Sequence, residues 1–215
     1  MNAPLPLSVL TLEAVLAPHP KTHTIQANQY VYQEGQKSTE LYRVQSGVVS
    51  LESVNERGER CIFHLIGKGS VVGHEALLRQ PRSLDLRACT EVLVEVISTP
   101  HAPDSTLGQS MIRWAHASMA RLLQDAARFR IELHRAQARE KVLLLLEQIR
   151  NLDPEMTDTC WLPSRSEMAD ILDINHATAS RVVARLFREG VLRRTANKEI
   201  SQVDWNLLGC RRSSA

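Results

Sequence analysis

The stretch SRSEMADILDINHATASRVVARLFREG, residues 164–190, reads as two short amphipathic helices with very little chain between them. Apolar residues recur at helical spacing over Ser164–Leu172 and again over His176–Glu189. Asp173–Asn175 is the whole connection, and Gly190 stands where a C-terminal helix cap is expected. Two helices joined by so short a turn predict a helix-turn-helix.

The residues beside these helices support this prediction. Ser164 is followed three residues later by Glu167, which is the pattern of a capping box at a helix start. After the second helix, Val191–Thr195 and Glu199–Val203 can pair as a hairpin across Ala196–Lys198. The pattern therefore predicts a winged helix-turn-helix.

The second helix carries arginine and hydroxyl side chains on its polar side. Thr178, Arg181 and Arg185 stay outside when the apolar residues face the first helix. A rigid helix of this kind fits a DNA major groove, where one arginine on guanine discriminates by about 1–3 kcal/mol. From His176 to the end there are eight Lys or Arg and three acidic residues, a net charge of +5. Such a patch is typical of nucleic-acid binding, although charge alone fits a solvated helix face equally well.

The first half of the chain has the pattern of a β-domain. Short runs rich in Val, Ile, Leu and Tyr alternate with glycine-containing turns, which predicts a sandwich or barrel. The candidate strands are His23–Ala27, Tyr30–Gln33, Glu40–Gln45, Val48–Val54, Arg60–Ile66 and Glu91–Ile97. A short helix is expected before them, around Leu7–Ala17.

A long helix is expected between the two halves, from Ser105 to about His134, with Ser105 or Thr106 as its cap. Its apolar stripe has a spacing close to that of a coiled coil. The stripe consists of Met111, Ala115, Ser118, Leu122, Ala126, Phe129 and Leu133. A helix of about 30 residues is about 45 Å long, so we expect this stripe to pair with a second copy. The alternative is that it packs on its own domain.

The second helix resembles the recognition helix of the CRP/FNR family of bacterial regulators, whose typical pattern is Glu-Thr-x-Ser-Arg. Thr178, Ser180 and Arg181 match this pattern, and Ala177 stands where the family has Glu. The resemblance implies that Ser180 and Arg181 read bases, with a half-site that differs at one position. Further candidates for base or phosphate contact are His176, Thr178, Arg185 and Arg165.

The resemblance extends over nearly the whole chain. Two loose blocks resemble the family's β-roll, and their order and spacing agree with those of the family. They comprise Glu34-Gly35, Leu41-Tyr42, Val44, Gly47–Val49 and Leu51, then Gly67, Gly69, Val72-Gly73, Glu75, Leu77-Leu78, Arg82-Ser83 and Arg87-Ala88. The implied α+β fold has a cyclic-nucleotide-binding-like β-roll (jelly roll) at 1–104, a dimerisation helix at 105–135 and a winged helix-turn-helix at 136–215.

The resemblance also indicates a ligand loop. Gly73, Arg82 and Ser83 keep the residues of the cAMP-binding branch, in which the loop and its Arg hold the phosphate. His74 replaces the Glu that takes the ribose hydroxyl, and the acid has moved to Glu75. The candidate ligand residues are Gly73, His74, Glu75, Arg82 and Ser83.

Base contacts in that branch come from a Thr-Ser pair, and Ala126-Ala127 takes its place here. A weak or absent response to cAMP is therefore expected, and the effector stays unknown. An iron–sulfur cluster is disfavoured, because no cysteine precedes Cys61. Haem is an alternative, because an imidazole or a thiolate can hold its iron. The candidates for that role are His19, His23, His64, His74, Cys61 and Cys89, although ordinary surface or hydrogen-bonded histidines and small core cysteines are the favoured interpretation.

Composition limits the function classes. The 215 residues contain no apolar run of 18 and no signal peptide, and Cys61, Cys89, Cys160 and Cys210 are far apart, which favours a cytoplasmic protein. No catalytic motif is present, so an enzyme is not expected, nor is a metal site. The expected function is an effector-dependent transcription regulator, a homodimer on palindromic DNA that also contacts RNA polymerase. The alternatives are a regulator of the same fold that needs no effector, or one that senses haem or thiol oxidation.

Overall fold

The computed structural model describes residues 21–99, 106–152, 158–196 and 200–210. The chain forms two compact units, residues 1–51 with 66–125 and residues 52–65 with 126–215. The helix expected around 7–17 lies outside the described residues. The assignment of residues 1–104, 105–135 and 136–215 to sensing, dimerisation and DNA binding remains a prediction.

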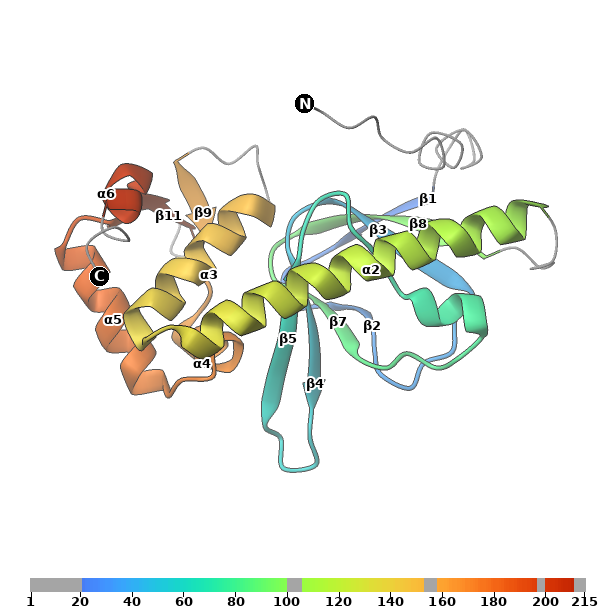
Figure 1. Cartoon of the computed structure of the whole chain (residues 1–215), viewed down its shortest axis with the longest axis horizontal. Coiled ribbons are helices and arrows are strands. Elements are labelled where there is room, and N and C mark those ends of the chain that lie inside the picture. Colours follow the sequence, from blue (N-terminus) through green and yellow to red (C-terminus); the bar gives the residue numbers. More distant parts are fainter. Residues whose placement is uncertain (1–20, 100–105, 153–157, 197–199, 211–215) are drawn as a thin grey trace. The chain divides into compact units, whose positions relative to one another are not determined.

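Two four-stranded sheets form the β-roll, as expected (Figure 1). The first sheet has the order β1 (Lys21–Ile25), β8 (Val92–Ser98), β3 (Glu40–Ser46) and β6 (Val71–Val72). The second has the order β2 (Tyr30–Tyr32), β7 (Asp85–Ala88), β4 (Val49–Val54) and β5 (Arg60–Ile66). The six predicted strands are confirmed to within two residues at each end, and β6 and β7 are additional.

The core of the β-roll is built from residues of both sheets. Val44 of β3 and Val94 of β8 face each other in antiparallel register, and neither is accessible to solvent. Val49 and Leu86 of the second sheet pack into the same cluster. Burial of this apolar surface is the main force that holds the two sheets together.

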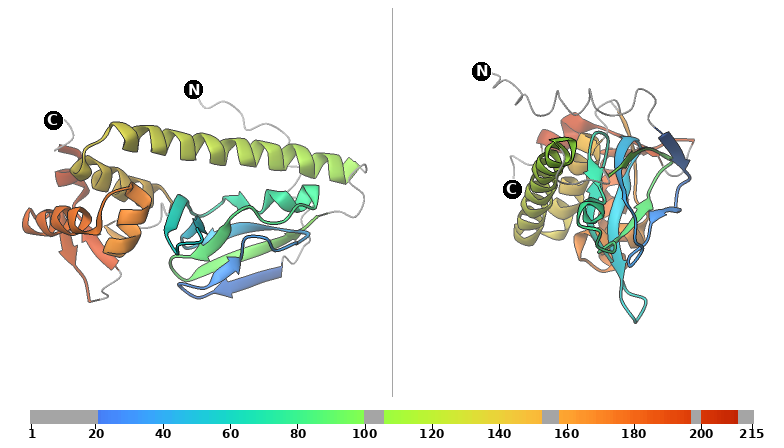
Figure 2. Two further views of the ribbon diagram at one scale, coloured as in Figure 1. Left: turned by 90° about the horizontal axis from the view of Figure 1, so that it is seen from below. Right: turned by 90° about the vertical axis from the view of Figure 1, so that its right-hand side faces the viewer.

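Helix α2 (Thr106–Arg135) is one unbroken helix of 30 residues (Figure 2). The expectation that its Met111–Leu133 stripe pairs with a second copy is wrong, because that stripe is covered by the chain itself. Met111 packs against a β-roll cluster that includes Leu41 and Ile97, and Leu122 packs against the other core cluster. A different stripe of α2 is exposed, and its large members are Met119, Leu123 and Ile131.

The second unit contains the predicted winged helix-turn-helix. Its helices are α3 (Ala138–Leu152), α4 (Arg165–Leu172), α5 (His176–Arg188) and α6 (Trp205–Cys210). A three-stranded sheet has the order β10 (Leu192–Arg194), β11 (Ile200–Val203) and β9 (Thr159–Trp161). The predicted hairpin is confirmed, with Leu192 opposite Val203, and β9 adds a third strand to it.

Within this unit the outer part of the β4–β5 hairpin is joined to the helices by arginines. Arg130 of α2 donates to the carbonyl oxygens of Ile62 and Phe63 on β5 and, at 3.0 Å, to that of Ile171 on α4. Arg60 of β5 donates twice to one carboxylate oxygen of Asp170, at 2.8 and 2.9 Å. Charge-assisted bonds of this kind are stronger than neutral ones, so they attach α4 firmly to β5.

Candidate nucleic-acid interface and ligand site

Local capping interactions fix the start and end of α4. The Ser164 side chain accepts from the Glu167 backbone N–H at 3.2 Å, and the Glu167 carboxylate accepts from the Ser164 N–H at 2.9 Å. The predicted capping box is therefore confirmed. At the other end Asp173 adopts a left-handed conformation with φ of 50° and so starts the sharp turn towards α5.

The turn leads directly into α5, whose first residue is His176. The Asn175 side chain caps the helix by accepting from the Thr178 N–H at 2.7 Å. Ala179, Val183 and Leu186 are completely buried, so one side of α5 is locked in place. The opposite side is therefore presented as a rigid surface.

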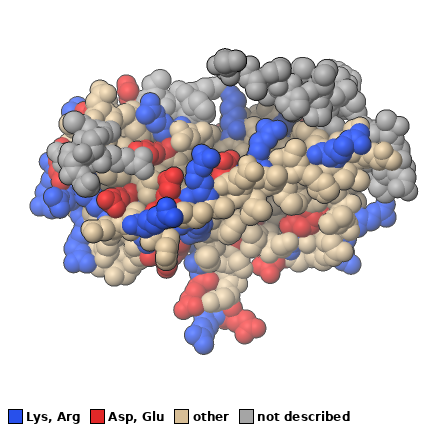
Figure 3. Space-filling view, viewed as in Figure 1, with Lys and Arg blue, Asp and Glu red and all other residues tan. Residues whose placement is uncertain are grey.

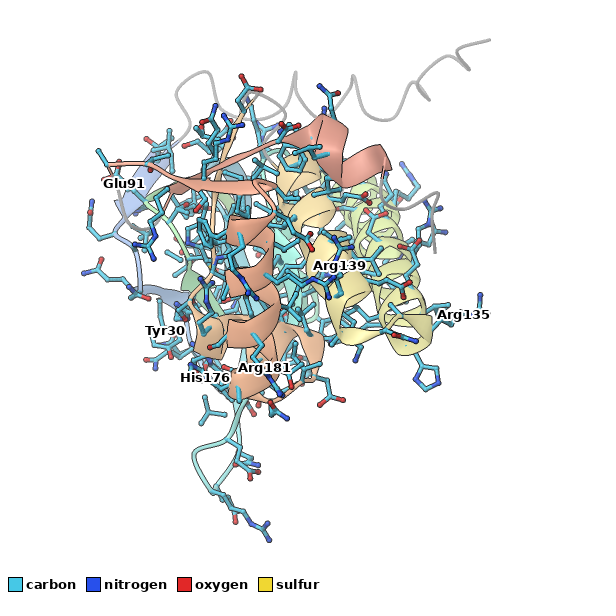
Figure 4. All side chains as sticks on the ribbon, turned by 90° about the vertical axis from the view of Figure 1, so that its left-hand side faces the viewer. Tyr30, Glu91, Arg135, Arg139, His176 and Arg181 are labelled. Carbon is cyan, nitrogen blue, oxygen red and sulfur yellow. The ribbon has the colours of Figure 1, made fainter. Side chains whose placement is uncertain are left out.

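The sequence-predicted base readers lie on this outer side. Arg181 is exposed, and its guanidinium donates to the Ala177 carbonyl at 3.3 Å and to the Thr178 hydroxyl at 3.2 Å. His176 is exposed at the first turn, and Ser180 is half-buried. Figure 4 shows His176 and Arg181 near the same end of α5. The arginine is folded back along its own helix and can extend by giving up two ordinary hydrogen bonds.

Arg185 lies in a different environment from Arg181. Its Nε donates to Glu189 at 2.8 Å, and Arg139 of α3 donates to the other carboxylate oxygen of Glu189 at 2.9 Å. The Arg185 side chain is still 63% exposed. Its Nε is therefore used by Glu189, while the rest of the exposed guanidinium can contact a base or a phosphate.

A pair of arginines extends the basic surface beyond α5. Burial lowers the pKa of Arg165, and the nearby positive charge of Arg194 on β10 lowers it further. Arg194 is exposed and lies over the Phe187 ring, 5.8 Å from its centre. Because the charge of Arg194 acts unfavourably on Arg165, an anion such as a phosphate near both would reduce the repulsion. Arg194 belongs to the basic C-terminal segment but is not among the six DNA-contact residues that the sequence predicts.

Figure 3 shows Lys and Arg side chains gathered at the edge of the view where Figure 1 places α5. The structure therefore places five of the six predicted DNA-contact residues on one helix. The sixth, Arg165, lies at the start of α4. The arrangement presents one exposed side of a helix together with basic side chains, a combination that fits a DNA major groove.

The predicted ligand loop is also well defined, and its central group is Arg82. This side chain is 1% exposed, and its guanidinium donates to the carbonyl oxygens of Gly73 and Glu40. Its Cζ lies 4.5 Å from the centre of the Tyr32 ring and 5.7 Å from that of Tyr42. The cation is thus held by carbonyls and aromatic rings of the chain itself.

Glu75 completes this arrangement from the short helix η1 (His74–Leu78). Its Oε1 accepts from the Ser83 backbone N–H at 3.1 Å, and its Oε2 lies 3.6 Å from Arg82 Nη1. Burial raises the pKa of Glu75, but bonds from backbone N–H groups and Ser83 together with the charge of Arg82 outweigh it and leave the pKa lowered. The group is therefore a carboxylate at neutral pH.

Gly73 and His74 shape the same loop. Gly73 has a φ of 84°, and a Cβ at this position would lie 2.5 Å from Arg82 Nη1. His74 is buried, and its Nε2 has no hydrogen-bond partner among the described residues. Burial lowers the pKa of His74, so its ring is neutral at pH 7. All five predicted ligand residues therefore lie in one loop region. Arg82, which the resemblance assigns to a ligand phosphate, is already hydrogen-bonded to carbonyl oxygens of the chain.

The residues considered for haem or thiol chemistry are dispersed. His64 is buried with its Nδ1 3.3 Å from Gln148 Nε2, and His23 is exposed on β1. Cys61 is exposed on β5, whereas Cys89 is buried. His19 lies outside the described residues. Within the described ranges no three His, Cys, Asp or Glu side chains are grouped to hold a metal ion, and no helix is long and apolar enough to cross a membrane.

Comparison with known proteins agrees with this architecture. Residues 22–102 match the model of the cyclic nucleotide-binding domain family. The chain is 30% identical over 199 residues to the transcriptional activator protein FnrL of Cereibacter sphaeroides, covering 84% of this chain and 75% of that protein. It is 29% identical over 155 residues to the transcriptional regulator SdrP of Thermus thermophilus, covering 71% and 74% of the two.

Solved structures share the fold. TTHB099, a CRP family transcriptional regulator from Thermus thermophilus, superposes with a TM-score of 0.73 at 22% identity, over 90% of this chain and 97% of that one. FixK2 from Bradyrhizobium japonicum gives 0.71 at 23% identity, over 89% and 96%. Together with the relatives in sequence, this similarity identifies the chain as a transcriptional regulator that belongs to the CRP/FNR family.

Proposed function

We propose that this chain binds a two-fold symmetric DNA site as a homodimer and regulates transcription from it. The observation that carries the proposal is the outer side of α5, where His176 and Arg181 are exposed on a helix whose other side is locked by burial. In this role Arg181 and Ser180 read bases. The remaining polar groups contact bases or phosphates: His176, Thr178, Arg185, Arg165 and, in addition to the predicted set, Arg194.

The dimer forms through α2. Met119, Leu123 and Ile131 are 44%, 62% and 53% exposed, and they follow one another at spacings of four or eight residues on one side of the helix. A second copy covers such a stripe by two-fold pairing of the two helices. Two α5 helices related by this axis enter successive major grooves about 34 Å apart.

Control through the β-roll does not follow the ordinary cAMP pattern. The carboxylate beside the ligand loop is Glu75, and it contacts Ser83 N–H and Arg82. Ala126 is buried and Ala127 exposed, so neither offers a hydroxyl to a base. We propose that the ligand-free form is competent for DNA and acts in the cytoplasm together with RNA polymerase.

The test is selection of genomic DNA fragments by purified, ligand-free protein at physiological salt. Enrichment of a palindrome with half-sites one helical turn apart is expected. Arg181→Ala should remove sequence preference while the dimer persists, because only α5 loses a base contact. Arg57→Ala, which removes an exposed arginine from the β4–β5 turn, is the matched control. Unchanged selectivity in Arg181→Ala would show that α5 is not the reading helix.

A further inference from the structure

The β-roll contains a small anion site with an unusual occupant. Its two donors to an anion are the Arg82 guanidinium, which is 1% exposed, and the backbone N–H of Ser83. Arg82 Nε is also buried and has no hydrogen-bond partner among the described residues. A buried guanidinium beside a loop N–H is a typical receptor for a phosphate or a carboxylate.

The occupant comes from the chain itself. Glu75 reaches back from η1 so that one carboxylate oxygen lies 3.1 Å from the Ser83 nitrogen and the other 3.6 Å from Arg82 Nη1. One carboxylate thereby faces both groups that would face two oxygens of a phosphate, while Arg82 also donates to the Gly73 and Glu40 carbonyl oxygens. The Glu75 side chain is 25% exposed and that of Arg82 is 1% exposed, so the carboxylate is the more solvent-accessible member of the pair.

We propose that Glu75 is a tethered anion that takes the place of a phosphate-bearing ligand and so determines that the site binds no free anion. The inference deepens the proposed function, because it supplies a structural reason for a regulator that needs no effector. The site itself is independent of DNA binding. Replacing Glu75 by an uncharged residue should remove the competing negative charge and so allow small molecules that carry a phosphate group to bind.

The covalent connection makes this occupation effective. A group held near its partner by a short stretch of chain has an effective concentration in the millimolar range or above. Arg82 follows Glu75 closely in the chain, and its N–H and C=O are bonded to Gln36 and Gly35 at 2.9 Å, so the arginine backbone is anchored. A free phosphate must therefore compete with a carboxylate that is covalently attached to the same loop.

The experiment uses the full-length protein and three variants. Glu75→Gln removes the charge at nearly constant shape, Glu75→Asp keeps the charge but shortens the reach, and Glu56→Gln removes an exposed carboxylate from the β4–β5 turn. Thermal unfolding is followed in chloride and in inorganic phosphate at equal ionic strength. Cyclic AMP is titrated calorimetrically into each protein.

Phosphate is expected to raise the Tm of Glu75→Gln while leaving wild type and Glu56→Gln unchanged. The affinity of Glu75→Gln for at least one of the two probes should exceed that of wild type by tenfold or more. Glu75→Asp should lie between them, which also covers the case in which Glu75→Gln folds poorly. A folded Glu75→Gln that binds neither probe, or a wild type that binds either one equally well, would overturn the proposal. Since no DNA is present, neither result depends on the proposed DNA-binding function.

Discussion

At the scale of single residues, Gly73 and Arg82 depend on each other. The φ of 84° at Gly73 is in the left-handed region, and its missing side chain leaves the space that the Arg82 guanidinium fills. The neighbouring Gly69 has an almost identical φ of 85°, but no atom lies within 4 Å of the position its Cβ would occupy. A comparison of substitutions at the two glycines therefore distinguishes the cost of backbone strain from the cost of a steric clash with Arg82.

Gly73→Ala is expected to lower the free energy of unfolding by more than Gly69→Ala does. Both variants strain a left-handed residue, at a cost of about 1–3 kcal/mol, but only the first also displaces a buried cation. Denaturant unfolding of both variants measures the difference. Equal losses would mean that Arg82 moves aside without cost.

The carboxylate of Glu75 predicts a dependence of stability on pH. Its pKa in the folded protein is below the ordinary value of 4.5, so its stabilising effect is complete above about pH 4.5. This effect is lost as the pH falls through the lower, folded-state pKa. Wild type should therefore be more stable than Glu75→Gln at pH 7, and the difference should shrink on acidification.

Urea unfolding of both proteins at a series of pH values checks this prediction. His74, whose pKa burial lowers, is present in both proteins, so its own titration largely cancels in the comparison. Glu56→Gln serves as the control for loss of a charge at an exposed position. A stability difference that stays constant down to acidic pH would contradict the assigned role of the carboxylate.

At the scale of secondary-structure elements, α2 has two apolar sides, of which one is covered by its own chain and the other is exposed. Met111 and Phe129 on one side are 5% and 8% exposed, whereas Leu123 on another side is 62% exposed. Leu123→Asp should shift the protein from dimer to monomer, because it puts a charge into the pairing stripe. Ala117→Asp, an exposed position away from that stripe, is the matched control.

Sedimentation velocity across a concentration series distinguishes the outcomes. A dimer that survives Leu123→Asp as well as it survives Ala117→Asp would exclude this stripe as the subunit interface. The circular dichroism of both variants should match wild type, since an exposed acidic residue leaves the helix intact.

Sequence patterns were sufficient for the elements that have a strong local signal. The capping box of Ser164 and Glu167, the two helices and six strands are where they were predicted. Periodicity showed that α2 has an apolar stripe but could not say what covers it, since a β-roll and a second helix satisfy the same spacing. Strands as short as Val71–Val72 carry too few residues for an alternating pattern.

The ligand loop illustrates a different limit. The resemblance indicates Gly73, Arg82 and Ser83, and the sequence shows that the acid stands one position later, at Glu75. That Arg82 is stacked on Tyr32, 50 residues away, depends on the pairing of β2 and β7 and on the core behind them. Electrostatic effects between distant residues, such as that of the Arg194 charge on the pKa of Arg165, arise only in the folded chain.

At the scale of the whole molecule, DNA affinity is expected to depend on salt through its phosphate contacts. Arg194→Ala should weaken binding to all sequences alike and reduce the slope of log K against log salt concentration by about one. Arg181→Ala should instead reduce discrimination between sequences. Fluorescence anisotropy with a specific and a scrambled duplex at several salt concentrations separates the two effects. A loss of sequence preference in Arg194→Ala would move that residue from phosphate to base contact.

The carboxylate at position 75 has a consequence for how such regulators diversify. On the proposal that Glu75 takes the place of a phosphate group beside Arg82 and Ser83, a single codon change at position 75 is enough to remove the internal anion. Responsiveness to a metabolite can thus be lost or regained in one mutational step. Lineages of this fold are therefore expected to alternate between signal-dependent and signal-independent descendants without rebuilding their sensor.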